Sequence, residues 1–158
     1  MQIPAPHVDI PRYMGDWYVI ASIPSRLEQD AFNAVESYAL DEDGTIRTTF
    51  TFRKGGFDGK PKKLTARGFV KDAATHAVWG MRIVWPFKSD YRIAWIADDY
   101  SQVVVAREKR DLVWIMARTP HVDDGDLARL KSFAQSLGYD VAKIQDVPQN
   151  GAPTALSH

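Results

Sequence analysis

Short runs in which apolar and polar side chains alternate fill the first three quarters of the chain. In residues 45–53, for example, Ile46, Phe50 and Phe52 share one face of an extended segment. Arg47 and Arg53 share the other face. A period of two residues, with many β-branched and aromatic side chains, is typical of half-buried strands. By this criterion we expect eight strands, at residues 17–23, 35–40, 45–53, 64–70, 77–85, 91–97, 102–106 and 112–117.

The pattern changes after the eighth strand. Leu127, Leu130, Phe133 and Leu137 recur at helical spacing behind the acid-rich segment 123–126, and Gly138 follows them. Acids near the start and a glycine just past the end are helix boundary signals. We expect a helix at about 123–137, a short final strand within 140–147 and a disordered tail at 149–158. Residues 1–10 are expected to be a tether, and residues 11–148 to form one domain.

Consecutive short strands joined by tight turns predict an all-β fold. Asp41, Asp43 and Gly44 form a hairpin signal, and residues 54–63 contain three glycines and are expected to form a loop. Eight antiparallel strands can close into an up-and-down barrel, which removes the sheet edges. We therefore expect an eight-stranded antiparallel barrel with the helix packed outside it. Such a barrel can hold one small ligand or be filled by its own side chains, and both alternatives stay open.

Composition narrows the range of functions. Lysine and arginine total 20, aspartate and glutamate total 20, and there is no cysteine. Balanced charge gives no reason to expect a nucleic-acid partner, and thiol chemistry is excluded. The four histidines are scattered, and no nucleophile motif or phosphate loop is present. We expect no metal, no cofactor and no catalytic residue.

Three separated motifs carry a resemblance to a known family. Gly15-Asp16-Trp17 resembles the first-strand GxW motif of the lipocalins, Asp98-Asp99-Tyr100 resembles their turn between strands six and seven, and Arg118 resembles the arginine that ends strand eight. The turn has Asp98 where threonine is usual. Residues 11–18, 85–87 and 112–120 are most similar to the bacterial outer-membrane branch. Together the motifs have the order and spacing of the family.

This resemblance implies binding and transport or storage of a small apolar ligand such as a fatty acid or lysophospholipid. It also implies a periplasmic or outer-membrane location. The sequence has no lipid-attachment cysteine and no secretion signal, so a cytoplasmic location stays open. Peripheral membrane association and a homodimer also stay open. The alternative functions are an enzyme acting on an apolar substrate in the same barrel and a dimeric interaction protein.

The motif positions set the direction of the barrel. Trp17 begins strand one and Arg118 ends strand eight, so both should close the same end, where a guanidinium can stack on an indole. With Gly15 they are expected to be structural. Alternation of side chains then predicts which residues face the interior near the open end. The predicted ligand-binding residues are Phe50, Phe52, Trp79, Met81, Ile83, Trp85, Tyr91, Leu112, Trp114 and Met116.

The same alternation gives further expectations for individual strands. Val19, Ala21 and Ile23 should face inward by the parity of Trp17, and the small residues Ala66 and Gly68 should face inward in strand four. The interior should be nearly uncharged, with Glu36 pointing outward. Lys60, Lys62 and Lys63 are expected on a basic loop near the mouth, where they either attract an anionic head group or are simply solvated.

Overall fold

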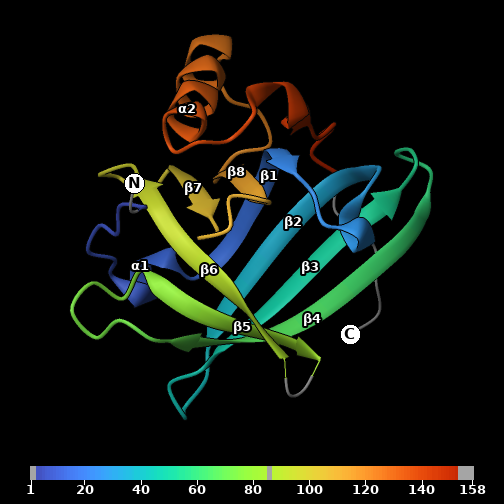
Figure 1. Ribbon diagram of the computed structural model, residues 1–158. Helices are drawn as coiled ribbons and strands as arrows, with labels where there is room; N and C mark the ends of the chain where they lie inside the picture. The colour runs from blue at the N-terminus through green and yellow to red at the C-terminus, as the bar shows by residue number, and fades with distance from the viewer. Residues whose placement is uncertain (1–2, 85–86, 153–158) are drawn as a thin grey trace.

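Eight antiparallel strands follow one another around a closed barrel in the computed structural model (Figure 1). The structure describes residues 3–84 and 87–152, without the side chains of residues 83, 84, 87 and 88. The strands are β1 (Gly15–Ile23), β2 (Ala31–Leu40), β3 (Ile46–Lys54), β4 (Lys60–Val70), β5 (Val78–Val84), β6 (Phe87–Ile96), β7 (Gln102–Ala106) and β8 (Val113–Ala117). β1 pairs with both β8 and β2, which closes the barrel. The predicted fold is confirmed.

A further strand, β9 (Gln145–Asp146), pairs with β1 outside the barrel. Helix α2 (Asp124–Ser136) also lies outside, above β7 and β8 in Figure 1. Its buried residues Leu130 and Ala134 belong to a cluster with Val104 and Ile115, whose side chains face outward from the barrel. A short 3-10 helix, η2 (Val141–Lys143), links α2 to β9. The wall formed by β7 and β8 is therefore covered by apolar side chains on its outer face, under α2, as well as on its inner face.

Four strands, β1, β2, β4 and β6, begin earlier than the sequence predicts. β2 starts at Ala31, and β4 starts at Lys60, so the loop expected at 54–63 is only a short hairpin connection. Lysine and proline are poor strand formers, but the ladder continues as far as the pair Lys54 and Lys60. Cross-strand hydrogen bonding overrides local propensity at this hairpin.

The parity of β1 changes in the middle of the strand. Its register against β8 shifts between Val19 and Ala21. Trp17 and Val19 belong to the core inside the barrel, whereas Ala21 and Ile23 pack with the cluster under α2. The expectation that Ala21 and Ile23 face inward is wrong, because a bulge moves every later side chain to the opposite face.

The ends of the chain pack onto the barrel. In the first ten residues, expected to be a tether, Ile3 and Val8 are buried, and the Val8 amide donates to the carbonyl of Thr75 at 2.8 Å. Helix α1 (Ile10–Tyr13) then crosses one end of the barrel. Near the other terminus, the Gln149 side chain donates to the carbonyls of Val19 and Ala34 at 2.9 Å each.

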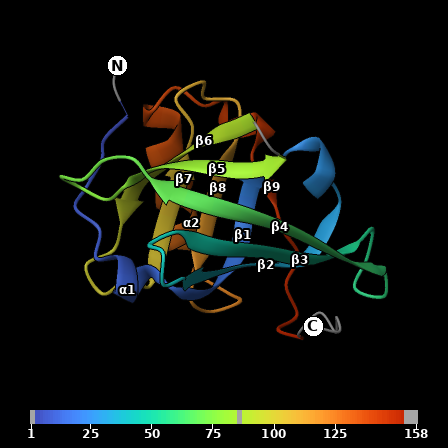
Figure 2. The ribbon, with the colours of Figure 1, turned by 90° about the horizontal axis from the view of Figure 1, so that it is seen from below.

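The two ends of the barrel differ. Figure 2 shows α1 at one end, and at the other the 3-10 helix η1 (Arg26–Glu28), the blue turn between β1 and β2, near the β3–β4 hairpin. The α1 end is filled with side chains, and the η1 end leads to a cavity.

Candidate functional site

A cavity of about 390 Å³ lies inside the barrel toward the η1 end. Small-molecule sites in proteins occupy roughly 300–1,000 Å³. Its wall is mostly apolar and draws on β2 to β8, with η1 at the entrance. The apolar side chains that line it are Phe50, Leu64, Ala66, Met81, Tyr91, Val105, Leu112, Trp114 and Met116, together with Leu27 of η1.

The predicted ligand-binding residues divide into three groups. Those that line the cavity are Phe50, Met81, Tyr91, Leu112, Trp114 and Met116. Phe52 is buried beside Phe50, at 5.1 Å between ring centroids, but does not line the cavity. Trp79 is buried at the closed end. Trp85 and the side chain of Ile83 lie outside the described residues. A role for any of them in binding stays a prediction.

Stacked aromatic rings form the floor of the cavity. Trp79 stacks on Tyr91 at 4.6 Å, and its plane meets those of Tyr13 and Tyr38 nearly edge-on at 5.6 and 5.8 Å. Such pairs contribute roughly 0.5–1.5 kcal/mol each beyond area burial. These rings fill the barrel below Tyr91, and the cavity lies on their other side, toward η1.

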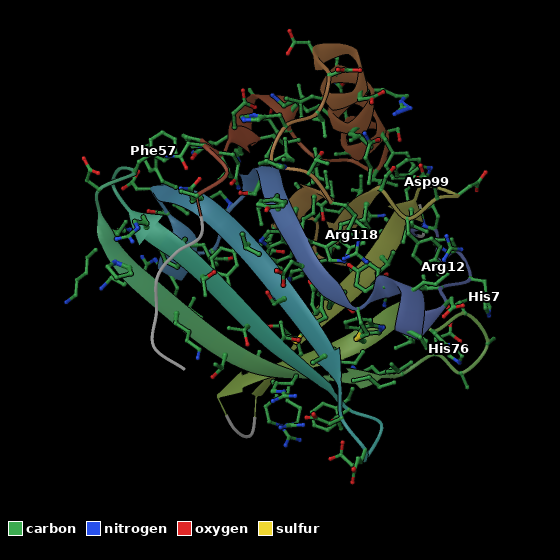
Figure 3. All side chains as sticks on the ribbon, turned by 180° about the vertical axis from the view of Figure 1, so that it is seen from behind. His7, Arg12, Phe57, His76, Asp99 and Arg118 are labelled. Carbon is green, nitrogen blue, oxygen red and sulfur yellow. The ribbon has the colours of Figure 1, made fainter. Side chains whose placement is uncertain are left out.

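Arg118 ties the closed end together. Its guanidinium lies 3.8 Å from the centroid of Trp17 and donates to the carbonyls of Arg12, Tyr13, Met14 and Asp16 at 2.8–3.2 Å. Figure 3 shows Arg118 and Arg12 at this end and Phe57 at the other. Gly15 has φ of +101°, and a Cβ there would lie 3.4 Å from Arg118 Nη1. Only glycine adopts this backbone readily.

The turn at residues 98–100 also packs onto this end. The Arg12 guanidinium lies 4.0 Å from the centroid of the Tyr100 ring and donates to the carbonyl of Asp98 at 3.4 Å. The Tyr100 hydroxyl accepts from the Asp9 amide at 2.8 Å. The three motifs, far apart in sequence, therefore brace one end of the barrel around α1.

The three buried tyrosines of the aromatic floor are joined by a directed chain of hydrogen bonds. Tyr91 donates to Tyr38 at 2.7 Å, and the hydroxyls of Tyr13 and Tyr91 lie 2.6 Å apart. A phenol has one proton, so Tyr13 must donate to Tyr91. Neither bond uses the Tyr38 proton. Tyr38 lies two residues from Glu36 on the same face of β2, and its hydroxyl lowers the pKa of the Glu36 carboxyl. Burial raises the pKa of all three phenols.

Glu36 points into the cavity, so the expectation that it faces outward is wrong. It lines the wall two residues before Tyr38 on β2 and is paired with Phe50 on β3. Desolvation, followed by repulsion from Glu28, raises the pKa of Glu36 to about 8, despite the opposite effect of the Tyr38 hydroxyl. Burial in the cavity therefore favours the protonated carboxyl over the ionised one.

The 3-10 helix η1 covers one side of the entrance. The Glu28 carboxylate accepts from Trp114 Nε1 at 3.1 Å, from the Ser25 amide at 3.2 Å and from the Ser25 hydroxyl. Leu27, within η1, is 58% exposed. The sequence did contain a signal for this element, because serine followed three residues later by glutamate is the pattern of a capping box.

Other charges lie around the entrance, so the expectation of a nearly uncharged interior is also wrong. Arg26, Asp90 and Arg107 line the cavity together with the two glutamates. Arg107 pairs with Asp111 at 3.2 Å, whereas no ion pair of Arg26 is found within the described ranges. Lys60, Lys62 and Lys63 lie in β4 rather than in a loop and are not among the lining residues.

The remaining chemistry of the site is sparse. Among the described residues, no group of three or more histidine, cysteine, aspartate or glutamate side chains could hold a metal ion. Within the same part of the chain, no helix is both long and apolar enough to cross a membrane. The arrangement is suited to enclosing an apolar molecule next to a few polar groups.

Comparison with known proteins agrees with this architecture. The family model of the lipocalin-like domain matches residues 8–149. Temperature-induced lipocalin-1 of Arabidopsis thaliana is 31% identical over 156 residues, covering 92% of this chain and 82% of the relative. Outer membrane lipoprotein Blc of Escherichia coli strain K12 is 27% identical over 147 residues, covering 91% and 81%.

Solved structures show the same fold at lower identity. Insecticyanin from the tobacco hornworm Manduca sexta superposes with a TM-score of 0.72 at 13% identity, covering 99% of this chain and 89% of that one. The cockroach allergen Per a 4 gives 0.67 at 20% identity, covering 95% and 94%. The chain belongs to the lipocalin family.

Proposed function

We propose that this lipocalin binds a fatty acid or a lysophospholipid inside its barrel and transports or stores it. The family is one of proteins that bind small hydrophobic ligands. The observation that carries the proposal is the cavity itself, which is enclosed by apolar side chains and opens at one end beside cationic groups. An acyl chain matches the first feature, and an anionic or zwitterionic head group matches the second.

The positions of the charges support one orientation. The aromatic floor closes the α1 end, so the methyl end of the acyl chain points toward it and the head group stays at the entrance. Arg26 is exposed there on η1 and lines the cavity. Its guanidinium is the cation best placed for a carboxylate or phosphate, because Arg107 already has a partner in Asp111.

Displacement of an environment-sensitive fatty-acid probe tests the proposal. Each buried methylene is worth about 0.8 kcal/mol, so affinity should rise about fourfold per methylene until the chain fills the cavity. It should then level off. Equal affinity for short and long acids, or no displacement by any of them, would refute the proposal.

A pair of variants on one strand localises the binding. Ala66 faces the cavity, whereas Lys63 on the same strand is exposed and does not line it. Ala66→Phe places a ring in the cavity and should weaken binding by at least tenfold, while Lys63→Phe should leave it within twofold. Equal effects of the two substitutions would place the acyl chain outside the barrel.

The location of the protein is a related proposal. Relatives named as outer-membrane lipoproteins support a site at the outer membrane or in the periplasm. Fractionation of the source cells tests it. Recovery of the protein with the cytoplasmic fraction alone would contradict it. Membrane association and a homodimer stay predictions, which vesicle flotation and sizing chromatography would test.

A further inference from the structure

One group in the cavity has no role in holding a plain hydrocarbon chain. Glu36 lines the wall beside Phe50, and an apolar ligand that covered it would leave its carboxyl without water. A buried polar group without a partner is unfavourable. A cavity evolved only for saturated chains would be expected to have an apolar side chain at this position.

The tyrosine chain ends beside this carboxyl. Tyr13 donates to Tyr91, and Tyr91 donates to Tyr38, so neither bond uses the Tyr38 proton. Glu36 and Tyr38 both line the cavity, two residues apart on the same face of β2. Because desolvation favours the neutral form of Glu36, its carboxyl then carries a hydroxyl. That hydroxyl is a hydrogen-bond donor available to a ligand.

We propose that Glu36 and Tyr38 form a polar subsite for an uncharged oxygen on the buried part of the ligand, so that the preferred ligand is an oxygenated acyl lipid such as a hydroxy or keto fatty acid. This inference rests on the proposed function and names the substrate class of the same cavity. Glu36 is then the residue that determines specificity.

The surrounding charges favour a neutral oxygen over an ionic group. Glu28 raises the pKa of Glu36 by repulsion, and the same repulsion opposes a ligand carboxylate at this depth. A ligand ammonium group would have to ionise Glu36 and enter a cavity that also contains Arg107. A hydroxyl or ketone oxygen accepts a hydrogen bond from the protonated Glu36 carboxyl and brings in no charge. It also loses less hydration on entering the cavity than a charged group does.

The test compares stearic acid, a positional series of monohydroxy and keto octadecanoic acids, and octadecylamine. Each displaces a fluorescent fatty-acid probe at pH 6.5 from the wild type and from Glu36→Leu, Glu36→Gln and the exposed-site control Glu42→Gln. Near-UV circular dichroism and thermal unfolding check that each variant is folded. Glu36→Gln keeps a hydrogen-bonding group of similar shape, so the test does not depend on Glu36→Leu alone.

The wild type and Glu42→Gln should bind at least one oxygenated isomer about tenfold more tightly than stearic acid. Glu36→Leu should abolish this preference, and Glu36→Gln should keep most of it. Equal binding of stearic acid and every oxygenated isomer by the wild type overturns the inference and leaves the proposed function standing. A preference that survives Glu36→Leu, or tighter binding of octadecylamine than of any oxygenated acid, also overturns it. Failure of every acyl compound to bind overturns both proposals.

Discussion

Replacing Glu36 by glutamine should change how stability depends on pH. The folded protein raises the pKa of Glu36 from 4.5 to about 8, first by desolvation and then by repulsion from Glu28. In the unfolded chain the group titrates near its ordinary value. Below pH 4.5 the carboxyl is protonated in both states, so it has no effect on the pH dependence. Between pH 4.5 and 8 the unfolded state loses its proton first, so the free energy of unfolding falls as pH rises.

The size of this loss follows from the shift. A change of one unit in pKa corresponds to 1.36 kcal/mol, so the full shift sets an upper limit of about 5 kcal/mol. Glu36 is only half-buried, and water at the cavity entrance screens the charge, so we expect a loss of about 3 kcal/mol by pH 9. Glu36→Gln cannot ionise and should gain stability relative to wild type by this amount as pH rises from 5 to 9.

Urea unfolding of both proteins at pH 5, 6, 7, 8 and 9 measures the effect. The difference between the two curves isolates Glu36 from the other groups around the cavity, namely Glu28, Asp90, Arg26 and Arg107, and from the buried tyrosines. Glu42→Gln, at an exposed hairpin position, should follow the wild type at every pH. A constant difference between wild type and Glu36→Gln across this range would refute the inference that the cavity raises the pKa of Glu36.

Three other predictions concern the closed end and the entrance. Arg118→Met removes a cation–π contact and four hydrogen bonds to carbonyls and should cost about 3 kcal/mol of unfolding free energy. The exposed Arg129→Met should cost under about 1 kcal/mol; equal costs in urea unfolding would contradict a bracing role for Arg118. Gly15→Ala should cost about 1–2 kcal/mol of unfolding free energy because Gly15 has a positive φ. The control Gly125→Ala, at a position with open space around it, should be neutral or stabilising. Thermal unfolding measures both, and an unchanged stability of Gly15→Ala would argue against backbone strain at that position. Trp114→Phe removes the hydrogen bond from the indole to Glu28 that holds η1 against the barrel. The dissociation rate of the fatty-acid probe, measured by stopped flow, should then increase about fivefold. An unchanged rate would show that η1 does not control release of the ligand.

Alternation along the strands was sufficient to predict most of the barrel interior. Phe50, Met81 and Met116 could be placed because each strand buries one face and Trp17 and Arg118 set the common direction. These features are local and repeat every two residues. The same reasoning failed in β1, because the bulge after Val19 depends on how β1 pairs with β8 and is not visible in β1 itself.

The polar part of the site was less predictable. A glutamate within an apolar strand is usually solvated, so Glu36 was expected to face outward. Its parity with Tyr38 does indicate the opposite orientation once Tyr38 is known to be inward. That knowledge comes from the contacts of Tyr38 with Trp79 and Tyr91, which lie 41 and 53 positions away in sequence. Long-range packing therefore decided the chemistry of the cavity.

The position of an acyl chain in the crystal is the most direct test of the central claim. The protein crystallised with stearic acid should show one molecule inside the barrel, its methylenes against Phe50 and Met81 and its carboxylate at the entrance near Arg26. An empty cavity, or stearic acid bound only on the outer surface of the barrel, would contradict the account.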